Sequence, residues 1–223
     1  MSYRGVTARN RRWAGVSAIA AFVVFTAANS LWAFEQPAPG ASASELISFY
    51  EEGSGRIVAG GLLSLVSLAI LVVAASALRS VLVELEPDEL LANAAFGGAI
   101  LGAAAGLGAE TINMAGALRA GDGELTAPLA LALFDISYVL GSYGAGIGIG
   151  LLTLATALAA LRTGTLLPRW MAVAGVVIGT AMITPLFGYA LGEYTVAPAF
   201  VLLLVLGVLL LRRSAVRAGP EHG

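Results

Sequence analysis

Long apolar stretches separated by short polar turns are the feature that most constrains the fold of this chain. The central pair runs from Leu90 to Leu161 and is interrupted only by the polar turn 119–126. About 20 apolar residues in a helix cross the roughly 30 Å hydrocarbon core of a bilayer. Because lipid offers the backbone no hydrogen-bond partners, such segments must be helical. The sequence therefore predicts an all-α fold, a polytopic transmembrane bundle.

The composition excludes a water-soluble globule and several kinds of chemistry. Of the 223 residues, 58% are hydrophobic and 12% are charged, whereas a soluble domain has about 25% charged residues. Cysteine is absent, the basic residues are all arginines, and the only histidine is His222. Disulfides, thiolate or histidine metal sites and lysine Schiff bases are therefore not expected. We expect no catalytic residues, no cofactor, no metal and no nucleic-acid partner.

The apolar runs predict six spans in a transmembrane domain that covers residues 13–211. A basic segment, 1–12, precedes this domain, and a polar tail, 212–223, follows it. The predicted spans are about 13–33, 57–78, 91–118, 128–161, 170–191 and 196–211. The fourth run would reach about 50 Å as one helix. We expect it to tilt, to kink at Gly141–Gly150, or to project beyond the hydrocarbon.

A signal peptide is the alternative to the first span. The segment 26–28, Thr-Ala-Ala, is an acceptable cleavage site after a short apolar core. Cleavage there would leave a mature protein that begins at Asn29. Trp32 and Phe34 extend the apolar run beyond the site, which favours a transmembrane helix.

The predicted outer loop, 34–55, is the longest connection. Ser42 and Glu45 have the spacing of a capping box, which starts a helix. Leu46, Phe49 and Tyr50 fall on one helical face. We expect a short helix that lies on the membrane surface, lids the bundle, or packs only its own apolar face.

The arginines predict the orientation of the bundle. Six spans place both termini on one side, and ten of the 12 arginines then lie on that side. Only Arg56 and Arg119 lie on the other. Because basic flanks stay in the cytoplasm, we expect a cytoplasmic membrane protein with cytoplasmic N- and C-termini.

Two acidic residues, Glu110 and Asp135, are flanked on both sides by long apolar sequence. Each lies nine residues from an end of the turn 119–126, so we expect them at similar depth, facing each other across the hairpin. An acid inside a bundle is a functional candidate by default. Neighbouring polar residues share their faces or their depth. The candidate polar site is Glu110, Asp135, Asn113, Tyr138, Ser142 and Asn29.

These residues allow more than one function. Two carboxylates in one pocket would share a proton, which suits proton-coupled transport. In the structural interpretation, Glu110 bonds a group such as Tyr138 between helices, and Asp135 is hydrated at the interface. We expect a non-enzymatic binding or structural membrane component. The alternatives are a small transporter or channel-like protein with an outward-facing carboxylate pair and, more remotely, an intramembrane enzyme.

The lipid bilayer is the expected partner of the chain. A homo-oligomer, a partner membrane protein, and a small polar ligand or a proton are left open. Glycines at four-residue spacing, Gly98, Gly102 and Gly106, and the run Gly144–Gly150 predict close approach of helix backbones.

Two segments carry a resemblance to known proteins. Residues 41–56 read ASASELISFYEEGSGR, and residues 161–170 read LRTGTLLPRW, ahead of a Gly-rich span. With its basic start, the chain resembles the small multi-pass membrane proteins of actinobacterial type that form a family of unknown function. The resemblance implies a multi-pass bacterial membrane protein and assigns no activity, cofactor or site residue.

Overall fold

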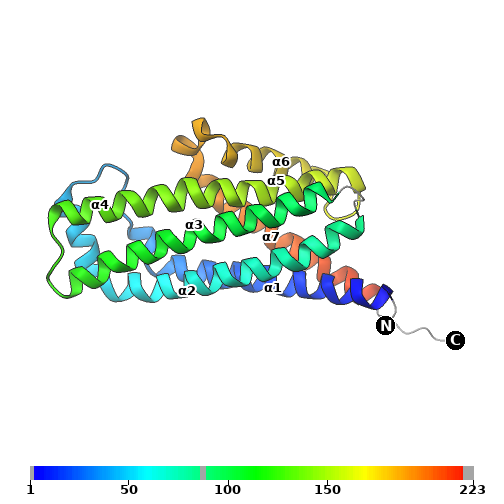
Figure 1. The fold of residues 1–223 in the computed structure, drawn as a ribbon, viewed down its shortest axis with the longest axis horizontal. Helices are drawn as coiled ribbons and strands as arrows, with labels where there is room; N and C mark the ends of the chain where they lie inside the picture. Colours follow the sequence, from blue (N-terminus) through cyan, green and yellow to red (C-terminus); the bar gives the residue numbers. More distant parts are fainter. Residues whose placement is uncertain (1–2, 86–88, 218–223) are drawn as a thin grey trace.

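The computed structural model describes residues 3–85 and 89–217, with side chains for 8–33, 35–85, 89–184 and 198–214. This part of the chain is an all-helical bundle without a strand (Figure 1), as predicted. The helices are α1 (Tyr3–Trp32), α2 (Ala43–Leu85), α3 (Leu90–Gly121), α4 (Ala127–Tyr138), α5 (Gly146–Thr163), α6 (Arg169–Ile183) and α7 (Pro185–Arg217). A 3-10 turn, η1 (Ala33–Glu35), follows α1, and a π-helical segment, η2 (Val139–Ala145), joins α4 to α5.

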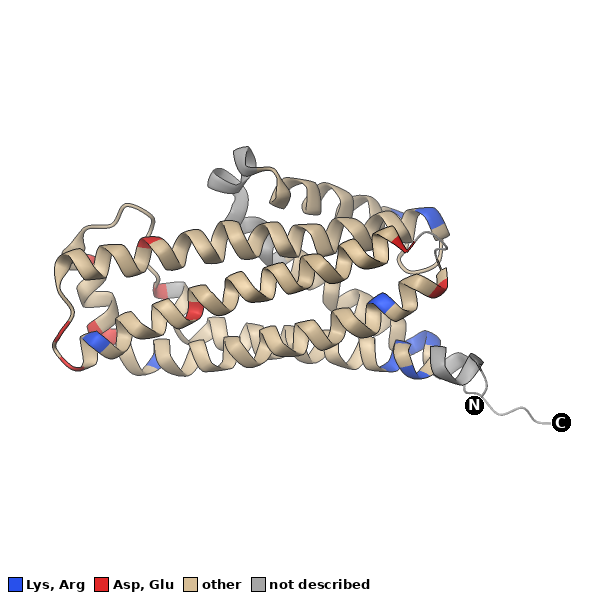
Figure 2. Cartoon of the chain, viewed as in Figure 1, with Lys and Arg blue, Asp and Glu red and all other residues tan. Residues whose placement is uncertain are grey.

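The two ends of the bundle differ in charge. Helix α1 begins and α7 ends at the same end (Figure 1). Most of the arginines gather there, as Figure 2 shows, and we call it the Arg-rich end. The loop 36–42 and the turn 122–126 lie at the opposite end, which carries Arg56 and Arg119 and which we call the Arg-poor end.

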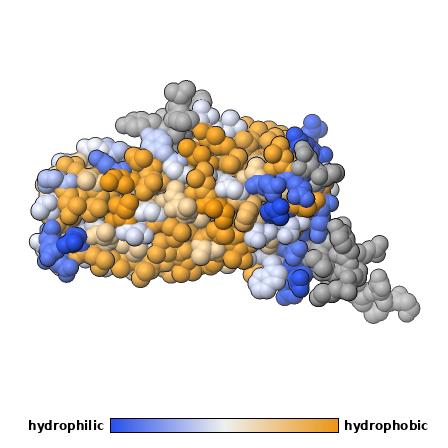
Figure 3. Space-filling model, in the orientation of Figure 1, coloured by the Kyte–Doolittle hydropathy of each residue, from blue (hydrophilic) through white to orange (hydrophobic). Residues whose placement is uncertain are grey.

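The surface between these ends is apolar. Within the described residues, four helical stretches are long and apolar enough to cross a membrane: Ala8–Trp32, Ala43–Leu85, Leu90–Gly121 and Ala127–Thr163. Large apolar side chains such as Val73 and Val177 are exposed on the helices, and Figure 3 shows them as a broad belt. A belt of this extent indicates contact with lipid, so the chain has the features of a membrane protein.

Helix α2 corrects the predicted outer loop. The capping box is confirmed, because the Ser42 amide donates to Glu45 Oε2 at 2.7 Å and the Glu45 amide donates to Ser42 Oγ at 3.4 Å. The helix does not stop, however, and continues to Leu85. Its buried Leu46, Tyr50 and Ile57 form one cluster with residues of α3 and α4. The short surface helix is therefore wrong, since this apolar face belongs to the core of the bundle.

The boundary between the last two helices also differs from the prediction. The predicted turn at 192–195 lies inside α7, and the chain instead breaks at Thr184. Thr184 has an extended backbone, with φ −84° and ψ 108°. Proline disfavours the helical conformation in the residue before it and lacks the N–H that would continue the ladder. Pro185 therefore ends α6 and begins α7.

Helices α3 and α5 pack at backbone distance. A Cβ on Gly98 would lie 2.6 Å from the Leu152 nitrogen and 2.8 Å from the Gly148 carbonyl oxygen. A Cβ on Gly148 would collide with the backbone of Gly102. The predicted close approach at these glycines is confirmed, and it fixes α3 against the long helix that η2 interrupts.

Candidate functional site

A polar cavity of about 480 Å³ lies at the Arg-poor end of the bundle. Three parts of the chain line it: the end of α1 with the loop up to Pro39, the stretch 109–113 of α3, and the stretch 137–142 of α4 and η2. The volume falls within the range of about 300–1,000 Å³ that is usual for small-molecule sites. The cavity is therefore large enough for a small solute.

The structure brings five of the six predicted site residues to this cavity. They are Glu110, Asn113, Tyr138, Ser142 and Asn29. Glu110 and Asn113 follow each other on one face of α3, as their spacing predicts. Asn29 also lines the cavity, although its Nδ2 already donates to the Phe25 carbonyl at 2.9 Å.

Asp135 does not join them, so the predicted pairing with Glu110 is wrong. Asp135 is exposed and does not line the cavity. The rotation of α4 is set by Phe134 and Ser137, which are buried. Burying a large aromatic ring is strongly favourable, and it turns the neighbouring carboxylate outward. The arrangement contains one carboxylate, and a shared proton is not part of it.

The carboxylate of Glu110 lies close to α2, and the residue also lines the cavity. Its Oε2 lies 3.6 Å from the point that a Cβ on Gly61 would occupy. The Ser64 hydroxyl lies beside the carboxylate, yet neither Ser64 Oγ nor Glu110 Oε2 makes a hydrogen bond of normal geometry within the described residues. Small side chains on α2 leave room for the carboxylate but do not satisfy it.

Two buried donors at the cavity also lack partners. They are Asn113 Nδ2 and Trp32 Nε1, neither of which has a hydrogen-bond acceptor among the described residues. Asn113 is only 4% exposed. Buried polar groups in folded proteins are nearly always hydrogen-bonded, so unpartnered groups of this kind are unusual. Three residues with such an atom, Glu110, Asn113 and Trp32, line the same cavity.

The surroundings of the cavity are negatively charged. Among the described residues, Glu110 is the only charged one in its lining. Both arginines of this end are paired: Arg56 donates to Glu35 at 2.6 Å, and Arg119 pairs with Glu124. The hydrogen bond from Arg56 holds the pKa of Glu35 below its usual range. Glu51, near the start of α2, and Asp122, in the turn after α3, have no ion pair among the described residues. Acidic residues also gather at this end in Figure 2. Such a field attracts cations to the cavity.

The π-helical segment η2 contributes Gly141 and Ser142 to the lining. Its position agrees with the irregularity predicted between Gly141 and Gly150. π-Helical turns are rare and occur frequently at functional sites. The segment widens the helix at the level of Glu110, which lets Ser142 reach the cavity while α4 keeps Phe134 in the core.

Sequence reasoning missed several lining residues. From the sequence, Trp32 only extends the first apolar run, and nothing singles out Gln36, Pro37 or Ser137. Each lines the cavity. The rotation of α1 and the path of the loop depend on contacts between helices, for which a single sequence carries no periodic signal. Helix α2 carries small residues at Gly60, Gly61, Ser64 and Ser67. They were the available clue that a side chain of α3 would lie against this helix.

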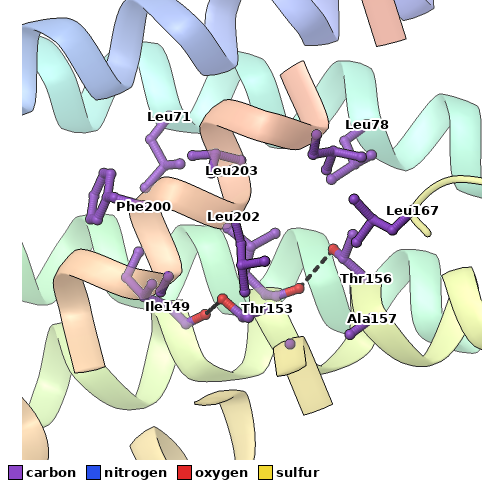
Figure 4. Close-up of a pocket in the computed structure, with 14 residues that line it drawn as sticks. Leu71, Leu78, Ile149, Thr153, Thr156, Ala157, Leu167, Phe200, Leu202 and Leu203 are labelled. Carbon is purple, nitrogen blue, oxygen red and sulfur yellow. Dashed lines mark hydrogen bonds between the residues drawn. The ribbon is translucent and has the colours of Figure 1, made fainter. Parts of the chain in front are cut away.

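A second cavity, between α2, α5, α6 and α7, offers no polar chemistry (Figure 4). It encloses about 30 Å³ and is lined mainly by leucines and Phe200. Thr153 and Thr156 donate to the carbonyls of Ile149 and Leu152 in their own helix, at 2.8 and 2.7 Å. We regard it as a packing gap. Among the described residues, no group of three or more His, Cys, Asp or Glu side chains is placed to hold a metal ion.

Comparisons with family models, with curated proteins and with solved structures return no match for this chain. The function is therefore argued from the cavity and its residues.

Proposed function

We propose that the chain is a multi-pass protein of the bacterial cytoplasmic membrane that binds a small, positively charged polar solute in the cavity at Glu110. The observation that carries this proposal is that residues with a buried, unpartnered polar atom, above all Asn113 and Glu110, line one 480 Å³ cavity. Leaving such groups unsatisfied costs about 1–3 kcal/mol each. A solute that satisfies them binds with a corresponding gain.

The lining specifies the chemistry of the solute. A carboxylate with aromatic rings nearby, here Glu110 with Trp32 and Tyr138, suits an ammonium group, which bonds to the carboxylate and is attracted by ring faces. The Trp32 and Asn113 donors need an acceptor, which a hydroxyl or carbonyl oxygen supplies. The favoured ligand is therefore a protonated amine that also carries an oxygen acceptor.

The membrane threading is part of the same proposal. The chain makes six passes: α1, α2, α3, the α4–η2–α5 unit, α6 and α7. Helix α6 is shorter than the other passes, and the break at Thr184 separates it from α7. The gathering of arginines at the Arg-rich end supports a cytoplasmic location for that end. The resemblance of segments 41–56 and 161–170 to actinobacterial-type membrane proteins supports the same membrane. The cavity then opens to the outside.

Binding is favoured over transport by the packing below the cavity. Between the cavity and the Arg-rich end, buried residues such as Leu68, Leu71, Ala99 and Ile149 form a continuous core. A solute would need a path through this core in order to cross. The proton-coupled alternative also loses its second carboxylate, since Asp135 lies outside the cavity.

Fluorescence of Trp32 tests the proposal directly. The chain has three tryptophans, and Trp13 and Trp170 are exposed near the Arg-rich end. Replacing both by Phe leaves Trp32 as the only indole, at the cavity. We expect ethanolamine, a protonated amine with a hydroxyl, to change its emission saturably at pH 7, and glycolate, an anion of similar size, to leave it unchanged.

A matched pair of variants provides the control. Glu110→Gln should weaken ethanolamine binding at least about tenfold, because hydrogen bonds to charged groups contribute about 1.5–3 kcal/mol. Asp135→Asn removes the same charge from the outside of α4 and should leave binding unchanged. Equal effects of the two variants, or equal responses to ethanolamine and glycolate, would refute the proposed site.

A further inference from the structure

A second polar cavity, of about 500 Å³, lies at the Arg-rich end of the bundle. It is bounded by Arg11 on α1, by Arg212 and Arg213 on α7, and by the connection 164–166 between α5 and α6. These segments are far apart in the sequence, and the fold brings three arginines to one hollow. The cavity is separate from the one at Glu110, which lies at the other end of the bundle.

The charge of this cavity is positive. Among the described side chains, no acidic residue lines it. Among the described residues, no ion pair involves Arg212 or Arg213. Guanidinium groups bind phosphate oxygens through two parallel hydrogen bonds, and they are suited to partly buried ion pairs because they are weakly hydrated. Arg212 and Arg213 at one cavity therefore offer a site for a phosphate group.

The floor of the cavity is apolar. Leu166 and Leu210, both buried, and Leu85 line it beneath the arginines. Thr165 adds a hydroxyl at the rim. Free phosphate gains nothing from such a floor, whereas a phospholipid places its phosphate at the rim and its glycerol and first methylenes on the leucines. Basic pockets between transmembrane helices are known to bind anionic headgroups.

We propose that this cavity binds the headgroup of an anionic phospholipid, with Arg212 and Arg213 on its phosphate. The lipid fills the gap between α1, α7 and the α5–α6 connection. The site is independent of the proposed solute cavity, so either can fail without the other.

Native mass spectrometry of the full chain released from detergent tests the site. Phosphatidylglycerol and phosphatidylcholine of identical acyl chains are titrated against the protein. We expect one phosphatidylglycerol to bind saturably and phosphatidylcholine to bind at least about tenfold more weakly. Equal binding of the two lipids would overturn the proposal without any variant.

Two double variants separate the cavity from general surface charge. Arg212→Gln with Arg213→Gln should weaken phosphatidylglycerol binding at least about tenfold, since each basic group near an anionic surface contributes about 1 kcal/mol. Arg12→Gln with Arg169→Gln removes the same charge from exposed positions near the same end, outside the lining, and should have little effect. If both pairs weakened phosphatidylglycerol binding equally, the binding would come from the general basic surface and the proposed site would be wrong.

A third arm distinguishes the lipid from free phosphate. Inorganic phosphate at 100-fold molar excess over the lipid should not displace phosphatidylglycerol, because the apolar floor favours the lipid. Full displacement would show a phosphate site and overturn the lipid assignment. Should the glutamine pair fail to fold, Arg212→Lys with Arg213→Lys keeps the charge and loses the bidentate geometry. It should weaken binding measurably, and wild-type affinity in that variant would count against the arrangement.

Discussion

At the scale of single residues, some hydroxyl groups in this bundle form hydrogen bonds between two helices, and others bond only to a carbonyl of their own helix. The Ser67 hydroxyl on α2 donates to the Ala21 carbonyl of α1 at 2.9 Å, and the bond is buried. Hydrogen bonds of this kind stabilise membrane proteins by about 0.6 kcal/mol on average. Ser67 is therefore a link between α1 and α2, whereas Ser80, farther along α2, bonds only to the Ser76 carbonyl.

The first prediction compares these two serines. Ser67→Ala should lower the free energy of unfolding by about 0.5–1.5 kcal/mol, because it leaves a buried carbonyl with one bond fewer. Ser80→Ala should change it by less than about 0.5 kcal/mol, as is usual for exposed sites. Unfolding by SDS in mixed micelles measures both, and an equal loss in the two variants would contradict the interhelical role of Ser67.

The residues of the candidate site show what spacing can predict. Glu110 and Asn113 are one helical turn apart, and the neighbouring glycines mark the packed face of α3, so their common orientation follows from helical periodicity. The prediction for Asp135 is wrong because Phe134, one residue before it, occupies the buried side of α4. Trp32 and Ser137 could not be found at all, since their positions depend on how α1 and α4 rotate in the bundle.

At the scale of elements, the contact between α3 and α5 depends on Gly148. Its hydrogen faces the α3 backbone, and a methyl group has no space there. Gly146 lies two residues earlier on the same helix, and a Cβ at that position would have no neighbouring atom within 4 Å. The two glycines therefore have the same surroundings in sequence and opposite surroundings in space.

The second prediction uses this pair. Gly148→Ala should lower the free energy of unfolding by about 1–3 kcal/mol, since it forces two backbones apart. Gly146→Ala should leave stability unchanged or raise it by up to about 1 kcal/mol, because alanine favours helix. SDS unfolding again gives both values. If Gly148→Ala were as harmless as Gly146→Ala, the close contact of α3 and α5 would be wrong.

The connection between α1 and α2 lines part of the cavity, and an ion pair holds its start. Arg56 bonds to Glu35, and the pKa of Glu35 is lowered by this bond. A carboxyl group whose pKa is lowered in the folded state contributes to the folded arrangement at neutral pH. That contribution is lost as the pH falls through the lowered pKa, so the loop stays anchored until the solution is more acidic than the usual pKa of a glutamate.

The third prediction follows from that sign. A spin label on Ala38→Cys, the only cysteine in such a variant, should report restricted motion at pH 7 and faster motion as the pH falls below about 4. Adding Glu35→Gln should give the faster motion already at pH 7. A label on Thr165→Cys at the other end should show no such change. Loss of anchoring well above pH 5 would exclude Glu35 as the cause.

The elements also show where prediction from sequence ends. The capping box at Ser42 is a local start signal, and the helix that it predicts is confirmed. The break before Pro185 was not predicted, because the fifth span was expected to run through it. The length of α2 was not predictable, because Gly53, Ser54 and Gly55 permit a turn equally well, and the buried partners of Leu46 and Tyr50 on α3 and α4 decide for the helix. Tertiary packing overrides a weak local preference.

At the scale of the whole molecule, an apolar belt separates two polar ends with opposite charge. The Arg-poor end holds the cavity at Glu110 under an acidic surface, and the Arg-rich end holds the cavity at Arg212 and Arg213. This asymmetry was predicted by counting arginines, because the rule that it follows depends on composition rather than on packing. The cavities themselves arise from the packing of helices and could not be predicted.

The hydrated cavity on the outside is the central claim, and cysteine labelling of intact cells tests it most directly. The wild-type chain has no cysteine, so single variants report cleanly. Ser142→Cys lies in the cavity, Val139→Cys lies three residues earlier in η2 and is 54% exposed to the apolar surroundings, and Thr165→Cys lies at the Arg-rich end.

A membrane-impermeant maleimide should label Ser142→Cys from outside, because the cavity admits water. The hydrated cysteine can then ionise to the thiolate that reacts with maleimide. The reagent should not label Val139→Cys, which faces lipid, and it should label Thr165→Cys only after the membrane is permeabilised. Labelling of position 142 only after permeabilisation would reverse the orientation. No labelling of position 142 under either condition would contradict the open polar cavity.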